Sequence, residues 1–138
     1  MGTTNPPTMN QVRAALGPDE IEYNKVKKKL GKSALIHLTK LAKGSDESLA
    51  SKAVYLASLI SSEESEQILL KAATSKSLPV RIAAVTGVKN MPKKSYNKVL
   101  TEILKNRNKT VREIAIQYYD KRKANPETAN KVSKLRKQ

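Results

Sequence analysis

A pattern of apolar residues recurs every 31 positions along the middle of the chain. Two sets of positions show it most clearly: Leu38, Leu69 and Leu100, and then Ala53, Ala84 and Ala115. Each unit predicts a helix, a short turn and a second helix. One such pair cannot bury its apolar side alone, so neighbouring pairs must stack on it. We therefore predict an all-α fold, an α-solenoid of short antiparallel helical hairpins with capping helices at both ends. An irregular helical bundle is the alternative.

Helix signals outnumber strand signals throughout the sequence. Apolar residues follow the helical spacing of three and four, with no sustained alternation and no Asn-Gly or Asp-Gly hairpin turn. Capping residues and prolines indicate where helices begin. We expect helix starts at Thr8, at Pro18, at Ser33, at Ser45, at Ser61 with Glu64 in a capping box, at Ser77, at Ser95, at Asn108 or Thr110, and at Asn125.

The start of the second helix in two of the units resembles that of HEAT repeats. Residues 78–84 read Leu-Pro-Val-Arg-Ile-Ala-Ala, and residues 109–115 read Lys-Thr-Val-Arg-Glu-Ile-Ala. The family pattern is an aspartate shortly before a Val-Arg pair, with an alanine three residues after the arginine. The resemblance covers residues 33–122 and implies three armadillo-like helical repeats.

The units depart from the family pattern at specific positions. Asp46 matches the aspartate in the first unit, but Ala50 stands there in place of the arginine. In the other two units Ser77 and Asn108 stand in place of the aspartate.

The flanks of the repeats are interpreted as caps. Residues 1–8 are expected to form a disordered N-terminal tail. Residues 9–138 are expected to form one HEAT-like α-solenoid domain. Within it, residues 9–30 supply N-terminal capping helices, residues 33–122 the repeats and residues 126–137 a C-terminal capping helix.

The sequence contains few residues of the types that commonly bind metals or act in catalysis. The chain has no cysteine and one histidine, which excludes thiolate zinc sites, iron–sulfur clusters and sites of several histidines. His37 occupies an apolar slot of the repeat, which favours a partly buried histidine over a catalytic base. A DNA glycosylase built from HEAT-like repeats is the enzyme alternative, but the chain has no tryptophan to surround an extruded base. We therefore predict a protein that is not an enzyme and uses no metal or cofactor.

Targeting signals do not stand out in the sequence. The first residues lack the basic and apolar segments of a signal peptide. No apolar stretch approaches the roughly 20 residues of a membrane span. We expect a cytoplasmic protein without a membrane partner.

The chain carries a large excess of positive charge. Lysine and arginine number 27 against 12 acidic residues, a formal net charge of +15. Solubility of a small domain needs a magnitude of about 2 to 8. The excess is spread over most of the chain, with an acidic interruption over residues 45–64. A polyanion is therefore the expected partner.

Basic residues near the turns inside the helical pairs form the first candidate site. Lys76 and Arg107 are equivalent in the repeat, as are Arg81 and Arg112, and Lys109 adds a further cation. Stacked units would align these residues in a ridge that contacts phosphates. For Arg81 and Arg112 a structural alternative stays open, in which they bond to neighbouring carbonyl groups.

A second basic cluster comprises Lys27, Lys28 and Lys29, which are also candidates for nucleic-acid binding. The Tyr118-Tyr119 pair lies beside further cations and could stack bases. Packing of one of these rings in the core is the favoured alternative.

No sequence-specific DNA-binding motif is present, so any nucleic-acid contact should be dominated by phosphates. We predict a non-enzymatic, basic helical-repeat module that binds nucleic acid, DNA or RNA, or a ribonucleoprotein surface. The alternative is a protein–protein interaction scaffold for an acidic partner.

Overall fold

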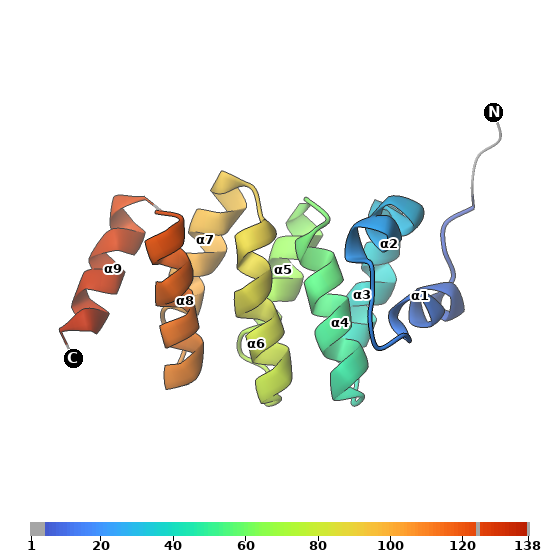
Figure 1. Cartoon of the computed structure of the whole chain (residues 1–138), viewed down its shortest axis with the longest axis horizontal. Coiled ribbons are helices and arrows are strands. Elements are labelled where there is room, and N and C mark those ends of the chain that lie inside the picture. Colours follow the sequence, from blue (N-terminus) through green and yellow to red (C-terminus); the bar gives the residue numbers. More distant parts are fainter. Residues whose placement is uncertain (1–4, 124, 138) are drawn as a thin grey trace.

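Helices account for the regular structure of the chain (Figure 1). The computed structural model describes residues 5–123 and 125–137. The elements are α1 (Met9–Leu16), α2 (Tyr23–Leu30), η1 (Lys32–Ala34), α3 (Leu35–Ala42), α4 (Glu47–Ser58), α5 (Glu63–Ala72), α6 (Leu78–Gly87), η2 (Val88–Asn90), α7 (Lys93–Ile103), α8 (Lys109–Lys121) and α9 (Pro126–Arg136). The described residues contain no strand, which confirms the predicted all-α class. No helix among them combines the length and the hydropathy that a membrane span requires.

Side-chain caps set the start of several helices. Thr8 and Gln11 form a capping box: Thr8 Oγ1 accepts from the Gln11 amide at 3.1 Å, and Gln11 Oε1 accepts from the Thr8 amide at 2.8 Å. Ser77, Asn108 and Asn125 each accept from the amide three residues further on. These bonds satisfy amide groups that a helix leaves unpaired at its start. These four predicted starts are confirmed. The starts predicted at Ser33, Ser45 and Ser95 are wrong, because α3 begins at Leu35, Asp46 caps α4 and α7 begins at Lys93 after Pro92.

The helix expected to begin at Pro18 begins at Tyr23, so this prediction is wrong. Residues 17–22 instead run along the side of the array, from the end of α1 to the start of α2 (Figure 1). Residues 18–20 form a bend, which a continuous helix from Pro18 would not contain. Lys52 Nζ donates to the Pro18 carbonyl at 3.1 Å, and Ile21 packs against the core.

The capping box expected at Ser61 and Glu64 is also wrong. Helix α5 is capped by Ser62, whose hydroxyl accepts from the Ser65 amide at 3.1 Å. The Ser65 hydroxyl in turn donates to the Ile60 carbonyl. Because Ile60 and Ser65 are both buried, core packing sets where this turn ends.

The helices form two rows that pack against each other. In one row α3, α5, α7 and α9 follow in order, each packed on the next, and α4, α6 and α8 form the other row. The pairs α3–α4, α5–α6 and α7–α8 also pack together. Figure 1 shows the turns inside these pairs along one common edge of the array, at the bottom of the view. The solenoid geometry and the HEAT type of the repeat stay predictions.

Small residues lie where helices of the second row approach each other. Ala53, Ala84 and Ala115 are fully buried. Gly87 of α6 lies so close to Ser58 of α4 that a methyl group on Gly87 would come within 2.7 Å of Ser58 Cβ. The close packing of α4 and α6 therefore depends on a glycine in addition to the alanines.

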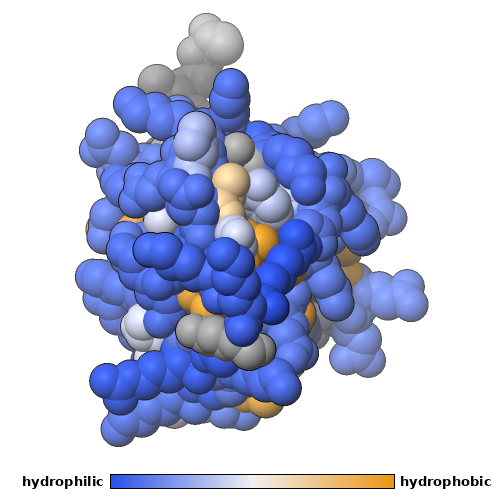
Figure 2. All heavy atoms as spheres, turned by 90° about the vertical axis from the view of Figure 1, so that its left-hand side faces the viewer, coloured by the Kyte–Doolittle hydropathy of each residue, from blue (hydrophilic) through white to orange (hydrophobic). Residues whose placement is uncertain are grey.

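Helices at both ends cover apolar faces. Helix α1 packs against α3 and α4 and buries Val12 and Leu16. Helix α9 packs against α7 and buries Val132. Figure 2 views the α9 end of the array and shows a mainly hydrophilic surface.

The predicted disordered tail over residues 1–8 lies outside the described residues at positions 1–4. At positions 5–8 the chain has no regular structure. Two bonds tie its end to the helices, because Thr8 caps α1 and the Pro7 carbonyl accepts from His37 Nε2 at 2.9 Å.

Candidate nucleic-acid interface

The turn between α5 and α6 is closed by an arginine. Arg81 Nη1 donates to the Ser75 carbonyl at 2.5 Å. The Ser75 hydroxyl accepts from the Ser77 amide at 3.1 Å. The arginine thus ties the second helix of the pair back onto the turn that precedes it.

The turn between α7 and α8 repeats this arrangement. Arg112 Nη1 donates to the carbonyls of Asn106 at 2.9 Å and of Arg107 at 2.8 Å. Asn106 Oδ1 accepts from the Asn108 amide at 2.9 Å. Both Arg81 and Arg112 are half-buried. Arg81 and Arg112 thus bond to neighbouring carbonyl groups, as the structural alternative from the sequence predicted.

A hollow of about 570 Å³, here called the turn hollow, lies between the two turns. Its lining residues are Thr74, Arg81, Lys105, Asn106, Arg107 and Asn108. Three of them are cations and none is a carboxylate. Asn106 Nδ2 also donates to the Ala73 carbonyl, which joins one turn to the other and holds the walls of the hollow.

Only some of the predicted site residues line the turn hollow. Arg81 and Arg107 do, whereas Lys76 is exposed outside it on the α5–α6 turn. Lys109 is exposed on α8, where its Nζ lies 3.7 Å from Glu113 Oε1. Sequence reasoning missed Lys105. The equivalent positions in the other two units hold Lys43 and Thr74, so the repeat does not show a basic residue at this position in every unit.

The second basic cluster lies elsewhere. Lys27, Lys28 and Lys29 are exposed in the last turn of α2. Figure 1 places α2 near the opposite end of the array from α7 and α8. The structure therefore does not bring these lysines together with the turn hollow.

Helix ends add to the positive potential at the turns. Helices α6 and α8 both begin there, and neither has an acidic residue in its first turn. The start of a helix carries a partial positive charge that favours anions. Lys105 Nζ lies 3.1 Å from Glu102 Oε1, but both side chains are about half exposed. Exposed pairs of this kind are weak, so Lys105 can turn to a stronger anion.

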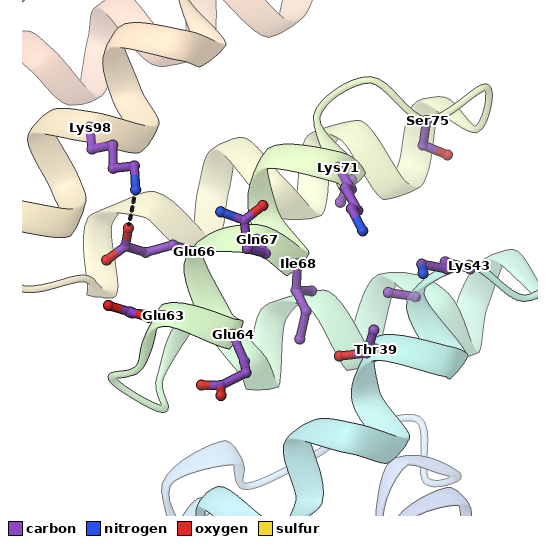
Figure 3. Close-up of a pocket in the computed structure, with 12 residues that line it drawn as sticks. Thr39, Lys43, Glu63, Glu64, Glu66, Gln67, Ile68, Lys71, Ser75 and Lys98 are labelled. Carbon is purple, nitrogen blue, oxygen red and sulfur yellow. Dashed lines mark ion pairs between the residues drawn. The ribbon is translucent and has the colours of Figure 1, made fainter.

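A second concave surface lies on the row of α3, α5 and α7 (Figure 3). It is a groove of about 640 Å³ whose lining is mixed in charge. Figure 3 shows Glu63 and Glu64 near the start of α5, with Lys43 and Lys71 towards the other end. This groove therefore offers no uniform potential to a polyanion.

Glu66 in this groove has a structural role. Its carboxylate lies 3.1 Å from Lys98 Nζ and accepts from the Ser95 hydroxyl at 2.8 Å. Burial raises the pKa of Glu66, but the bonds from Ser95 and Lys98 outweigh it, and the pKa falls below its usual value. The ionised carboxylate thus joins α5 to α7.

His37 is half-buried and bonded to the chain before α1. Because the Pro7 carbonyl can only accept, His37 Nε2 carries the proton in this bond. His37 Nδ1 is buried and has no partner among the described residues. Nor do three or more histidines, aspartates or glutamates gather in the described part of the chain as ligands for a metal ion.

No protein-family model matches the chain, and no curated protein matches it in sequence. The candidate interface is therefore defined by the geometry of the turns, and the resemblance to HEAT repeats stays a prediction.

Proposed function

We propose that the chain is a non-enzymatic, basic helical module that binds nucleic acid through its phosphates at the turn hollow. One observation carries the proposal. Two consecutive turns place Arg81, Lys105 and Arg107 around one hollow that has no carboxylate in its lining. A cytoplasmic location and a HEAT-like solenoid are parts of the same proposal.

The hollow suits a phosphate group for physical reasons. Phosphate oxygens accept several hydrogen bonds from guanidinium and ammonium groups, and arginine offers planar paired donors. The start of α8 at Asn108 adds backbone dipoles that favour an anion. A net charge of +15 attracts a polyanion over a longer range and speeds its association.

Such an interface recognises charge and not sequence. Phosphates carry no base information, so affinity should depend weakly on sequence. Each phosphate neutralised releases condensed counterions, so affinity should fall steeply as salt rises. Lys76 and Lys109, exposed on the same turns, extend the basic surface beyond the hollow.

The alternative function is a scaffold for an acidic protein. The groove of Figure 3 is larger than the turn hollow, but Glu63 and Glu64 are among its lining residues. These carboxylates would repel an acidic partner. The mixed charge of the groove thus favours nucleic acid at the turns over an acidic protein in the groove.

The test is an affinity titration of the full chain with duplex DNA, single-stranded DNA and RNA over a range of salt concentrations. In the Lys105→Ala/Arg107→Ala variant the slope of log affinity against log salt should shrink by about 0.9 per contact on duplex DNA. The Lys76→Ala/Lys109→Ala variant should show a similar loss if the ridge extends beyond the hollow.

A matched control removes the same charge elsewhere. Lys134 and Lys137 are exposed at the α9 end, and the Lys134→Ala/Lys137→Ala variant should keep the parent slope. Equal loss in the control and in the hollow variant would show that only net charge matters. Absence of binding to any nucleic acid at low salt would overturn the proposal and favour the scaffold.

A further inference from the structure

The five tyrosines of the chain divide into two groups. Tyr96 and Tyr119 are buried, at 1% and 9% exposed. The Tyr96 hydroxyl shares its one hydrogen between two carbonyl oxygens at the end of α8, those of Tyr118 at 3.1 Å and Arg122 at 2.6 Å. Tyr23, Tyr55 and Tyr118 are half-buried, and within the described residues their hydroxyls have no hydrogen-bond partner. Of the adjacent pair in α8, Tyr119 thus lies in the core and Tyr118 at the surface.

The three half-buried rings are linked across the surface. Tyr23 and Tyr55 meet edge to face, with ring centroids 4.9 Å apart and an interplanar angle of 64°. Lys89 Nζ lies 5.9 Å from the Tyr55 centroid and 6.0 Å from the Tyr118 centroid. Residues from α2, α4, η2 and α8 thus form one aromatic and basic surface, here called the tyrosine row.

Positive charge surrounds the tyrosine row. Lys89 and Lys121 are exposed and have no carboxylate partner within the described residues. Lys52 lies one helical turn before Tyr55 on α4, on the same face. The nearby carboxylate of Asp120 is already paired with Arg136 and with Lys123. Glu22, which precedes Tyr23, is paired with Lys25. The Tyr55 and Tyr118 end of the row therefore has cations without a carboxylate partner beside half-buried rings.

Aromatic rings beside cations suit a particular ligand. Nucleobases stack on tyrosine rings whatever their sequence, and lysines contact the phosphates between them. Stacking of a base outweighs an exposed cation–π contact, so a base can displace Lys89 from a ring face and leave the lysine to a phosphate. Bases in a duplex are already stacked on each other, so only unpaired bases can use such a surface.

We propose that the tyrosine row binds single-stranded nucleic acid, with unpaired bases on Tyr55 and Tyr118 and a phosphate at Lys89. The row is separate from the turn hollow, because α8 carries Tyr118 near its last residue and the hollow at its first. The proposal rests on the proposed function only in taking nucleic acid as the partner.

The test uses the tyrosine emission of the full chain, which no tryptophan obscures. A short poly-thymidine oligonucleotide should quench this emission as it binds, and its duplex with poly-deoxyadenosine should quench it much less. The Tyr55→Leu/Tyr118→Leu variant should bind the single strand roughly tenfold more weakly per ring and keep its affinity for the duplex.

The matched control is Tyr55→Phe/Tyr118→Phe, which keeps both rings. It should retain the parent affinity for the single strand but lose most of the quenching. An unchanged affinity in the leucine variant would overturn the proposal. So would parent quenching by poly-glutamate as strong as by the oligonucleotide, because that polymer brings charge without bases.

The two proposals fail in different ways. If the parent binds only the duplex, the tyrosine row has no such role, while the turn hollow keeps its own. If the leucine variant loses duplex and single-strand affinity equally, the rings support the fold and not a ligand. If Lys105→Ala/Arg107→Ala leaves binding intact while the leucine variant loses the single strand, the row is the site and the hollow is not.

Discussion

The turn of the first helical pair differs from the two turns that follow it. Arg81 and Arg112 occupy equivalent positions in the later pairs, and each bonds to a turn carbonyl. At the same position α4 has Ala50. The later turns also hold Ser75 or Asn106, whose side chain accepts from the cap residue, where the first has a glycine.

Burial explains this difference. Arg81 and Arg112 are half-exposed, whereas Ala50 is 0% exposed. Helix α1 packs against both α3 and α4, in the place where α5–α6 has a preceding helical pair. A buried guanidinium without a partner is costly, and alanine avoids that cost. The first pair thus has a buried alanine where each later pair has an arginine clamp, that is, an arginine that bonds to a carbonyl of its own turn.

The turn without the arginine clamp also differs in charge from the two turns that have it. Asp46 caps α4 and accepts from the Leu49 amide at 3.0 Å, and Glu47 follows in the first turn. The later caps are Ser77 and Asn108, both neutral. An anion should therefore be repelled at the first turn and attracted at the second and third.

Placing an arginine at position 50, in the first helical pair, should have the largest effect on stability. We expect Ala50→Arg to lower the free energy of unfolding by about 3–5 kcal/mol, since a long charged side chain would replace a fully buried alanine. Chemical denaturation of the full chain measures this loss. Ser51→Arg, at the neighbouring half-exposed position on α4, should change stability much less. A neutral effect of Ala50→Arg would mean that the first helical pair can accommodate the arginine clamp.

Removing a clamp from a later turn should have a smaller cost. Arg112→Ala loses two bonds from a charged donor to turn carbonyls, so we expect a loss of about 1.5–3 kcal/mol by chemical denaturation. Lys109→Ala loses only an exposed ion pair on the same helix and should cost under about 0.5 kcal/mol. Equal effects of the two variants would contradict a structural role for Arg112.

Neutralising the first turn should have the smallest effect on stability. Asparagine caps helices as well as aspartate, so Asp46→Asn/Glu47→Gln should change the free energy of unfolding by less than about 0.5 kcal/mol. Affinity for duplex DNA should rise at low salt and converge with that of the parent at high salt, because a screened repulsion has been removed. The salt titration measures both effects.

Glu63→Gln/Glu64→Gln is the matched control, since it removes the same charge from the far end of α5. This variant should leave the affinity at the turns unchanged. If instead the affinity of the Asp46→Asn/Glu47→Gln variant rose by the same factor at every salt concentration, the gain would not come from a screened repulsion.

Local interactions made much of the fold predictable. Thr8, Ser77, Asn108 and Asn125 cap their helices through bonds that span three residues, so their neighbours in the chain suffice to identify them. The starts at Pro18 and Ser61 were mispredicted because tertiary packing set them.

The candidate site was only partly predictable. The repeat identified Arg81 and Arg107, but Lys105 joins them only because Asn106 of one turn reaches Ala73 of another. That contact spans 33 residues, and no local pattern reports it. The repeat alignment places Tyr118 in the slot of the buried residues Leu56 and Gly87, but the structure buries Tyr119 and leaves Tyr118 half-buried. The register of the last helix face therefore differs from what the alignment indicates.

By itself the sequence determined the all-α class, the repeating helical pair and the positive charge, because these depend on residue type and on spacing along one helix. Tertiary structure alone decided which cations stay accessible. Arg112 bonds to its own turn, whereas Arg107 faces the turn hollow, although both lie in the same short segment. The same holds for Tyr118 and Lys89, which meet because stacking brings α8 beside η2. The direction of a side chain across a helix interface depends on the neighbouring helix, and that neighbour is about one repeat away in the chain.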